Sequence, residues 1–116
     1  MANTFKLKTK SGVNGSALDD IYTVPASTTA VIIGLTLSNI LGQSITADAK
    51  IVTAASSGDN GDDVYIVKDV PLPAGSSIEV MSGNKIILEA GDMVKAAGSN
   101  GSGNDADVIL SIMEIT

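Results

Sequence analysis

The alternation of apolar and polar residues with a period of two constrains the fold of this chain more than any other feature. It is clear in residues 44–54, where the two sets of positions are Ile45, Ala47, Ala49 and Ile51 against Thr46, Asp48, Lys50 and Val52. Successive side chains of a β-strand point to opposite faces, so this pattern predicts a strand with one buried face. No segment of ten or more residues combines helical spacing with capping residues. The alternation therefore predicts an all-β chain.

Turn-forming residues divide the chain into about eight or nine segments of this kind. The expected strands are residues 5–10, 21–24, 28–41, 44–54, 64–68, 76–81, 85–89, 93–97 and 108–115. Segment 71–75 leads into a strand, and the segment 98–104, rich in Gly, Ser and Asn, is expected to be an exposed loop. Turns every ~8–12 residues indicate an antiparallel β-sandwich or a jelly-roll-like barrel. A length of 116 residues predicts a single domain, residues 1–116.

The first expected strand separates its charges from its apolar residues. Phe5, Leu7 and Thr9 fall on one face, and Lys6, Lys8 and Lys10 fall on the other. This pattern predicts a half-buried strand, which we expect at the edge of a sheet. The stripe holds three of the seven positive charges of the chain, so its lysines are candidates for binding an acidic partner. Lysines on an edge strand also prevent unwanted strand pairing, and the sequence favours neither role.

The last expected strand has apolar residues on both faces. Val108, Leu110, Ile112 and Glu114 alternate with Ile109, Ser111, Met113 and Ile115. Such a strand is expected to be central in a sheet or packed at an interface. Only 17% of all residues are charged, below the typical ~25%. A well-filled core explains this composition, and so does a surface covered by other subunits. We expect a homo-oligomer.

The side chains that most enzymes use are missing from this chain. It has no His, Cys, Trp or Arg, and therefore lacks the usual acid–base group, the thiol nucleophile and the bidentate phosphate clamp. Its Ser and Thr residues have no histidine base to activate them. The only glutamates are Glu79, Glu89 and Glu114, each in or beside a strand where alternation can point it outward. The sequence predicts no enzyme and no cofactor.

The charge of the chain disfavours nucleic acid as a partner. The net charge is −6, and seven lysines alone would have to supply phosphate contacts. Residues 30–37 form the most apolar stretch, which is too short to span a membrane. The first eight residues contain no apolar core of a signal peptide. We expect a protein made in a cytoplasm that binds neither membrane nor nucleic acid.

One acidic loop is a candidate cation site. It reads Asp59-Asn60-Gly61-Asp62-Asp63, and carboxylate oxygens are the ligands that Ca²⁺ prefers. The loop lacks the bidentate Glu at position twelve of an EF-hand, and the same composition is typical of a solvated hairpin tip. Asp105 and Asp107, beside the Gly/Ser-rich segment, have the same two interpretations. We therefore predict no metal ligand.

Several stretches resemble a known family. They are Tyr22 to Leu35, Val70 to Val80, Lys85 to Leu88 with Ala90-Gly91-Asp92, and the ending Leu110 to Ile115. They are similar to small structural proteins in the virions of tailed bacteriophages, especially the marine T4-like ones. The resemblance covers most of the chain from Tyr22 onward and implies a non-enzymatic β-sandwich exposed on a capsid or tail. It implies no catalytic residues.

The resemblance and the composition together predict a phage virion protein, assembled in the host cytoplasm. We expect a small accessory or decoration protein on the capsid surface, which binds the major capsid protein or other virion proteins. A trimer is the favoured oligomer, by analogy with decoration proteins on local three-fold positions. The alternatives are a neck, tail or baseplate component, or a module that binds carbohydrate or a host surface.

Overall fold

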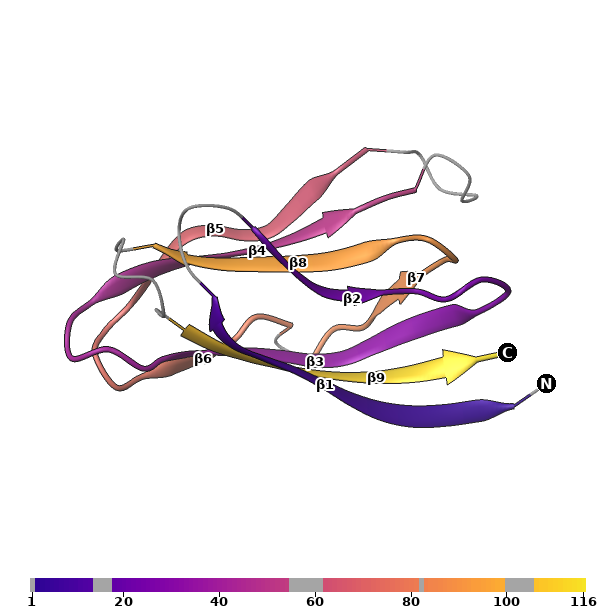
Figure 1. The fold of residues 1–116 in the computed structure, drawn as a ribbon, viewed down its shortest axis with the longest axis horizontal. Coiled ribbons are helices and arrows are strands. Elements are labelled where there is room, and N and C mark those ends of the chain that lie inside the picture. The colour runs from indigo at the N-terminus through magenta and orange to yellow at the C-terminus, as the bar shows by residue number, and fades with distance from the viewer. Residues whose placement is uncertain (1, 14–17, 55–61, 82, 100–105) are drawn as a thin grey trace.

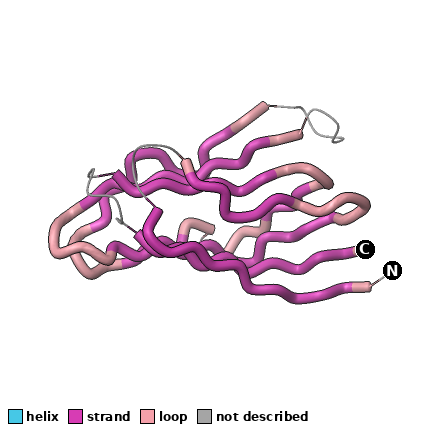
Figure 2. Tube along the Cα trace, in the orientation of Figure 1, coloured by secondary structure: helices cyan, strands magenta, loops and turns pink. Residues whose placement is uncertain are grey.

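The computed structural model describes residues 2–13, 18–54, 62–81, 83–99 and 106–116. Within these ranges the chain forms nine β-strands and no helix (Figures 1 and 2). The strands are β1 (Asn3–Val13), β2 (Asp19–Thr23), β3 (Thr29–Asn39), β4 (Ile45–Val52), β5 (Val64–Leu72), β6 (Ser77–Glu79), β7 (Ile86–Leu88), β8 (Met93–Ser99) and β9 (Ala106–Ile115). The predicted all-β class is confirmed.

The strands form two antiparallel sheets that pack face to face (Figure 1). The first sheet has the order β1-β9-β3-β6, with β7 pairing with β3 beside β6. The second has the order β2-β8-β4-β5. The chain crosses between the sheets at nearly every connection, and the two four-strand orders are those of a jelly roll with β7 added. The predicted antiparallel sandwich of jelly-roll type is therefore correct.

The side chains at alternate positions of the strands fill the space between the two sheets. In β4 the predicted inner residues Ile45, Ala47, Ala49 and Ile51 are all buried. In β9 the even-numbered positions face the core, and the strand lies between β1 and β3 as a central strand. The predicted hairpin is also present, because β4 pairs antiparallel with β5.

The orientation of β1 differs from the prediction. The strand is at a sheet edge as expected, but Phe5 and Leu7 are 72% and 64% exposed on the outer face. Lys6, Lys8 and Lys10 are in register with the inward-facing residues of β9, so the lysines lie on the side of the second sheet. Alternation separates the two faces of a strand, but in an edge strand the apolar face need not be the one that faces the core. At the margin of a sandwich, long lysine stems can pack inside while their ammonium groups stay near water.

Most strand ends differ from the prediction by one to four residues, and two of these differences change what a segment was expected to form. Gly98 and Ser99 belong to β8, where they pair with Ala47 and Thr46, so the expected exposed loop does not begin at residue 98. The rest of that segment, residues 100–104, lies outside the described residues. Pro71 belongs to β5, which is an edge strand, and an edge can tolerate the missing N–H of proline.

The turn before β8 is hydrogen-bonded to the segment that follows β2. The Gly91 N–H donates to the Val24 carbonyl at 3.0 Å, and the Val24 N–H donates to the Asp92 carbonyl at 2.9 Å. Gly91 has a φ of +90°, which side chains disfavour, and a Cβ at this position would lie 2.8 Å from the Cβ of Ala54. Both the backbone conformation and the available space therefore require glycine here.

Gly91→Ala is expected to lower the free energy of unfolding by about 2–4 kcal/mol, from left-handed strain together with the clash at Ala54. Urea denaturation measures the loss. Gly42→Ala is the matched control, because Gly42 has an unstrained φ and a Cβ added there would meet nothing within 4 Å. Equal stabilities of the two variants would contradict the prediction.

Candidate interaction surface

The outer face of the first sheet carries a row of apolar side chains across four strands. Phe5 of β1 pairs with Met113 of β9, Met113 pairs with Val31 of β3, and Val31 pairs with Ile87 of β7. Directly paired residues of neighbouring strands lie on the same face, so these four side chains form one line. We call the outer surface of β1, β9, β3 and β7 around this line the apolar face.

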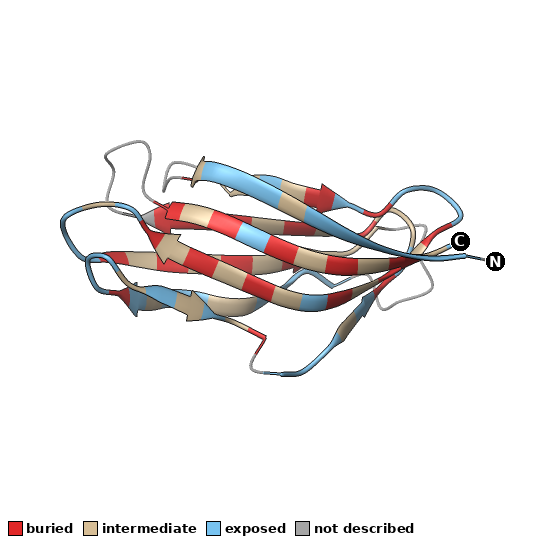
Figure 3. Cartoon of the chain, turned by 90° about the horizontal axis from the view of Figure 1, so that it is seen from below, coloured by how far each residue is buried: buried red, intermediate tan, exposed pale blue. Residues whose placement is uncertain are grey.

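The neighbouring rows of the apolar face are also uncharged. Asn3, Ile115 and Thr29 form the row on one side, and Leu7, Ser111 and Gly34 form the row on the other. Five of the eight large apolar side chains exposed in the described residues lie on this face: Phe5, Leu7, Ile33, Ile87 and Ile109. Figure 3 looks onto the face, and no described segment crosses in front of β9 and β3. An exposed apolar patch of this kind marks an interaction site more often than a free surface.

The outer face of the second sheet is different in character, because it carries charges in pairs. Lys95 contacts Asp20 at 2.9 Å, and Lys68 lies 3.9 Å from Asp48. The carboxylates of Asp48 and Asp69 raise the pKa of the Lys68 ammonium group. The Lys50 ammonium lies 5.1 Å from the centre of the Tyr65 ring. This sheet face has the composition of a surface that stays in water.

The lysine stripe of β1 is partly occupied by contacts within the chain. The Lys6 ammonium lies 2.8 Å from Glu114 Oε1, and the Tyr22 hydroxyl donates a hydrogen bond to Glu114 Oε2. The Lys8 ammonium lies 5.8 Å from the centre of the Tyr22 ring. Lys10 makes no ion pair with a described residue. The three lysines therefore differ, and Lys10 is the one most available to a partner.

The Glu114 carboxylate is buried, with 5% of the residue exposed, although alternation allowed it to point outward. The hydrogen bond from Lys6, and then that from Tyr22, lower the pKa of Glu114 below its ordinary value. Burial, followed by the hydrogen bond to Glu114, raises the pKa of the Tyr22 hydroxyl. The cluster thus holds a charged carboxylate and a neutral phenol at neutral pH, and it ties β1 and β2 to β9.

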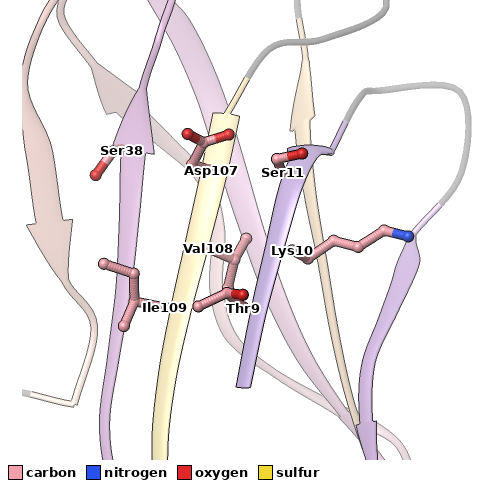
Figure 4. Close-up of a pocket in the computed structure, with 7 residues that line it drawn as sticks. All are labelled: Thr9, Lys10, Ser11, Ser38, Asp107, Val108 and Ile109. Atoms are coloured by element: carbon pink, nitrogen blue, oxygen red, sulfur yellow. The ribbon is translucent and has the colours of Figure 1, made fainter. Parts of the chain in front are cut away.

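An open hollow of about 500 Å³ lies at one end of the apolar face (Figure 4). Its lining residues are Thr9, Lys10, Ser11, Ser38, Asp107, Val108 and Ile109. Asp107 Oδ1 accepts a hydrogen bond at 3.1 Å from the Gly12 N–H, at the bulge where β1 leaves its register with β9. The hollow therefore combines hydroxyl groups with one carboxylate that already supports the backbone. No aromatic ring lines it, whereas sugar sites usually stack their ligands on such rings.

The acidic candidates of the sequence form no cation site in the described residues. Residues 59–61 and Asp105 lie outside those ranges. The described part of that loop makes an ordinary turn contact, because Asp63 Oδ1 accepts a hydrogen bond from the Thr53 N–H at 3.0 Å. Among the described residues, no group of three or more acidic side chains is placed to hold a metal ion. The same residues contain no helix of the length and apolarity needed to cross a membrane.

Three polar residues with structural roles carry no signal in the sequence. Asp92 is 1% exposed, and its two carboxylate oxygens accept hydrogen bonds from the Ala54 and Glu89 N–H groups, each at 2.9 Å. Glu79 Oε1 accepts hydrogen bonds from the Leu35 and Met81 N–H groups at 3.2 and 2.8 Å. Asn39 is also buried. Each satisfies backbone groups near the end or bulge of a strand, and so holds the scaffold that presents the apolar face.

Comparisons with known proteins find distant resemblances among solved structures. No protein-family model matches the chain, and no curated protein matches it. Among solved structures, a protein of Bacillus endospore appendages, described as disulfide-linked pili, is 14% identical with a TM-score of 0.49, covering 98% of this chain and 88% of the other. The VP2 subviral particle of infectious bursal disease virus is 9% identical with a TM-score of 0.41. That match covers 97% of this chain and 36% of the VP2 chain, so this chain spans about a third of it.

Proposed function

We propose that this protein is a non-enzymatic structural subunit of a tailed-phage virion, an accessory or decoration protein that self-associates on the capsid surface. The observation that carries the proposal is the apolar face, whose central row crosses four strands without a charged residue and which is exposed to solvent in the single chain. The polar clusters of the described residues hold the fold together, and none pairs a nucleophile with a base. An assembly role explains why so much apolar surface is exposed.

The second support is the charge pattern of the edge strand. The chain is acidic, yet β1 presents three lysines side by side on one margin of the sandwich. We propose that this stripe contributes to attachment by meeting an acidic surface on the capsid or another virion protein. Lys6 is tied to Glu114, so Lys10 is expected to contribute most.

Co-sedimentation with purified capsids that lack their accessory proteins tests whether the lysine stripe contributes to attachment. The wild type is expected to sediment with them, and binding should weaken from low to high salt because exposed charges are screened within ~8 Å. Lys10→Gln is expected to weaken binding several-fold, and substituting all three lysines by Gln to weaken it further, each pair being worth ~0.2–1 kcal/mol.

Lys85→Gln is the matched control, since it removes the same charge from an exposed position outside the stripe. A wild type that does not bind capsids would overturn the accessory role. Binding that is insensitive to both salt and the lysine substitutions would show that the stripe only protects the edge of the sheet.

A further inference from the structure

We propose that the apolar face is a two-fold interface, at which a second copy of this chain packs sheet against sheet. The inference rests on the proposed function, because it names the partner in self-association. It also specifies which surface is buried and which surfaces remain free for the capsid. Three properties of the face favour a second copy as its occupant.

The first property is shape. The row of Phe5, Met113, Val31 and Ile87 runs across four strands, and its two end members, Phe5 and Ile87, are 72% and 69% exposed. Open sheet faces of this kind pack on other sheets at a spacing of ~10 Å, with their strands nearly aligned. The molecule already contains one such packing between its own two sheets. A second copy would supply another sheet with matching twist.

The second property is charge. Copies of a chain with a net charge of −6 repel one another, and the outer face of the second sheet carries paired charges that would lose water on contact. The central rows of β1, β9 and β3 contain no charged residue. Charged side chains flank them on the side of β6 and β7, where the Glu79 carboxylate reaches over Gly34 and the exposed Lys85 and Glu89 stand two residues before and after Ile87. Asp107 lies at the end of the face. The surface of this chain that best complements the apolar face is therefore the apolar face of another copy.

The third property is area. Three strands at ~4.8 Å over about seven residues at ~3.4 Å, with the three residues of β7 beside them, give a face of roughly 390 Å² in projection. A pair of copies would bury roughly 780 Å² in projection, and more in accessible area because the side chains protrude. A biological interface is expected to exceed about 1,000 Å² in total. With its protruding side chains the face comes close to the lower size limit of a specific dimer.

A two-fold arrangement follows from the use of one face by both partners. Such a contact is isologous: the same patch meets itself, and association stops at two copies unless another surface is used. The inference therefore replaces the trimer expected from sequence with a dimer. The lysine stripe and the charged face of the second sheet remain accessible in this dimer.

Sedimentation velocity across a concentration series tests the dimer. The wild type is expected to be a dimer at micromolar concentration, and Phe5→Ser with Ile87→Ser to raise its dissociation constant by roughly 100-fold or more. Both side chains are exposed in the single chain, so the fold should persist, which thermal melting checks. The matched control is Ile40→Ser with Val64→Ser, which removes two exposed apolar side chains elsewhere and should remain a dimer.

Cross-linking tests the symmetry of the contact. The chain has no cysteine, so Ser111→Cys places a single thiol within the apolar face, and a short bismaleimide should join two copies through it. Lys50→Cys, on the outer face of the second sheet, should give no covalent dimer under the same conditions.

A monomeric or trimeric wild type, a Phe5→Ser/Ile87→Ser variant that remains a dimer, or equal cross-linking at both thiols would each overturn the inference. These results are independent of capsid binding. A dimer that fails to bind capsids contradicts the accessory role alone, and a monomer that binds them contradicts the dimer alone.

Discussion

Replacing Asp92 by Ala is expected to lower the free energy of unfolding by about 3–5 kcal/mol, one of the largest effects of any single substitution in this chain. The Asp92 side chain is buried and accepts hydrogen bonds from two backbone N–H groups, of Ala54 and Glu89. Alanine would leave both donors facing an apolar gap. An unsatisfied buried donor costs ~1–3 kcal/mol, and two of them lie side by side here.

Urea denaturation measures this loss, and two variants separate its causes. Asp92→Asn retains one oxygen that can accept a hydrogen bond but turns an amide N–H₂ toward the other donor. Its loss of unfolding free energy should therefore lie between those of the wild type and Asp92→Ala. Asp63→Ala removes a carboxylate that also accepts from a backbone N–H, that of Thr53, but at an exposed site where water replaces it. Its cost should stay below ~1 kcal/mol. If Asp92→Ala and Asp63→Ala lost equal stability, burial at Asp92 would not matter as proposed.

The sequence predicts the strands well because alternation is a local property. Residues 44–54 reveal β4 and its inner face without reference to any other part of the chain. The length of β3 and the central position of β9 are likewise visible as long apolar runs flanked by turns. The number of strands and the sandwich architecture follow from these segments together.

Which side of an edge strand faces inward is not a local property. In β1 the apolar residues Phe5 and Leu7 predict a core contact, yet they face outward and the lysines face inward. The inward position of Lys6 depends on Glu114, which lies at the other end of the chain. The apolar face was therefore invisible in the sequence, because its central row joins residues from four separate strands.

Replacing Glu114 by Ala is expected to cost about 2–4 kcal/mol at neutral pH, because it leaves the buried Tyr22 hydroxyl without its acceptor and Lys6 without its counter-ion. Glu114→Gln should cost less, since the amide oxygen can still accept from Tyr22. Tyr22→Phe should also cost less, since it removes the donor together with the need for it. Urea denaturation at pH 7 ranks the three variants.

The pH dependence of stability gives a sharper test of the same cluster. The pKa of Glu114 is lower in the folded chain than in the unfolded chain, mainly because Lys6 and then Tyr22 donate hydrogen bonds to it. Its contribution is complete above the ordinary pKa of ~4.3 and is lost as the pH falls through the folded value. The pKa of Tyr22 is raised by burial and by Glu114, so its contribution is complete below ~10 and is lost as the pH rises further.

The difference in unfolding free energy between the wild type and each variant isolates these groups from the other carboxylates. The advantage of the wild type over Glu114→Gln should be constant from pH 5 to 8 and should shrink below pH ~4.3. Its advantage over Tyr22→Phe should shrink above pH ~10. Lys6 and Lys8 also face the cluster, and both are present in the wild type and in each variant. A wild-type advantage over Glu114→Gln that stays constant down to pH 2 would show that the charge of Glu114 contributes nothing to holding β1 against the sandwich.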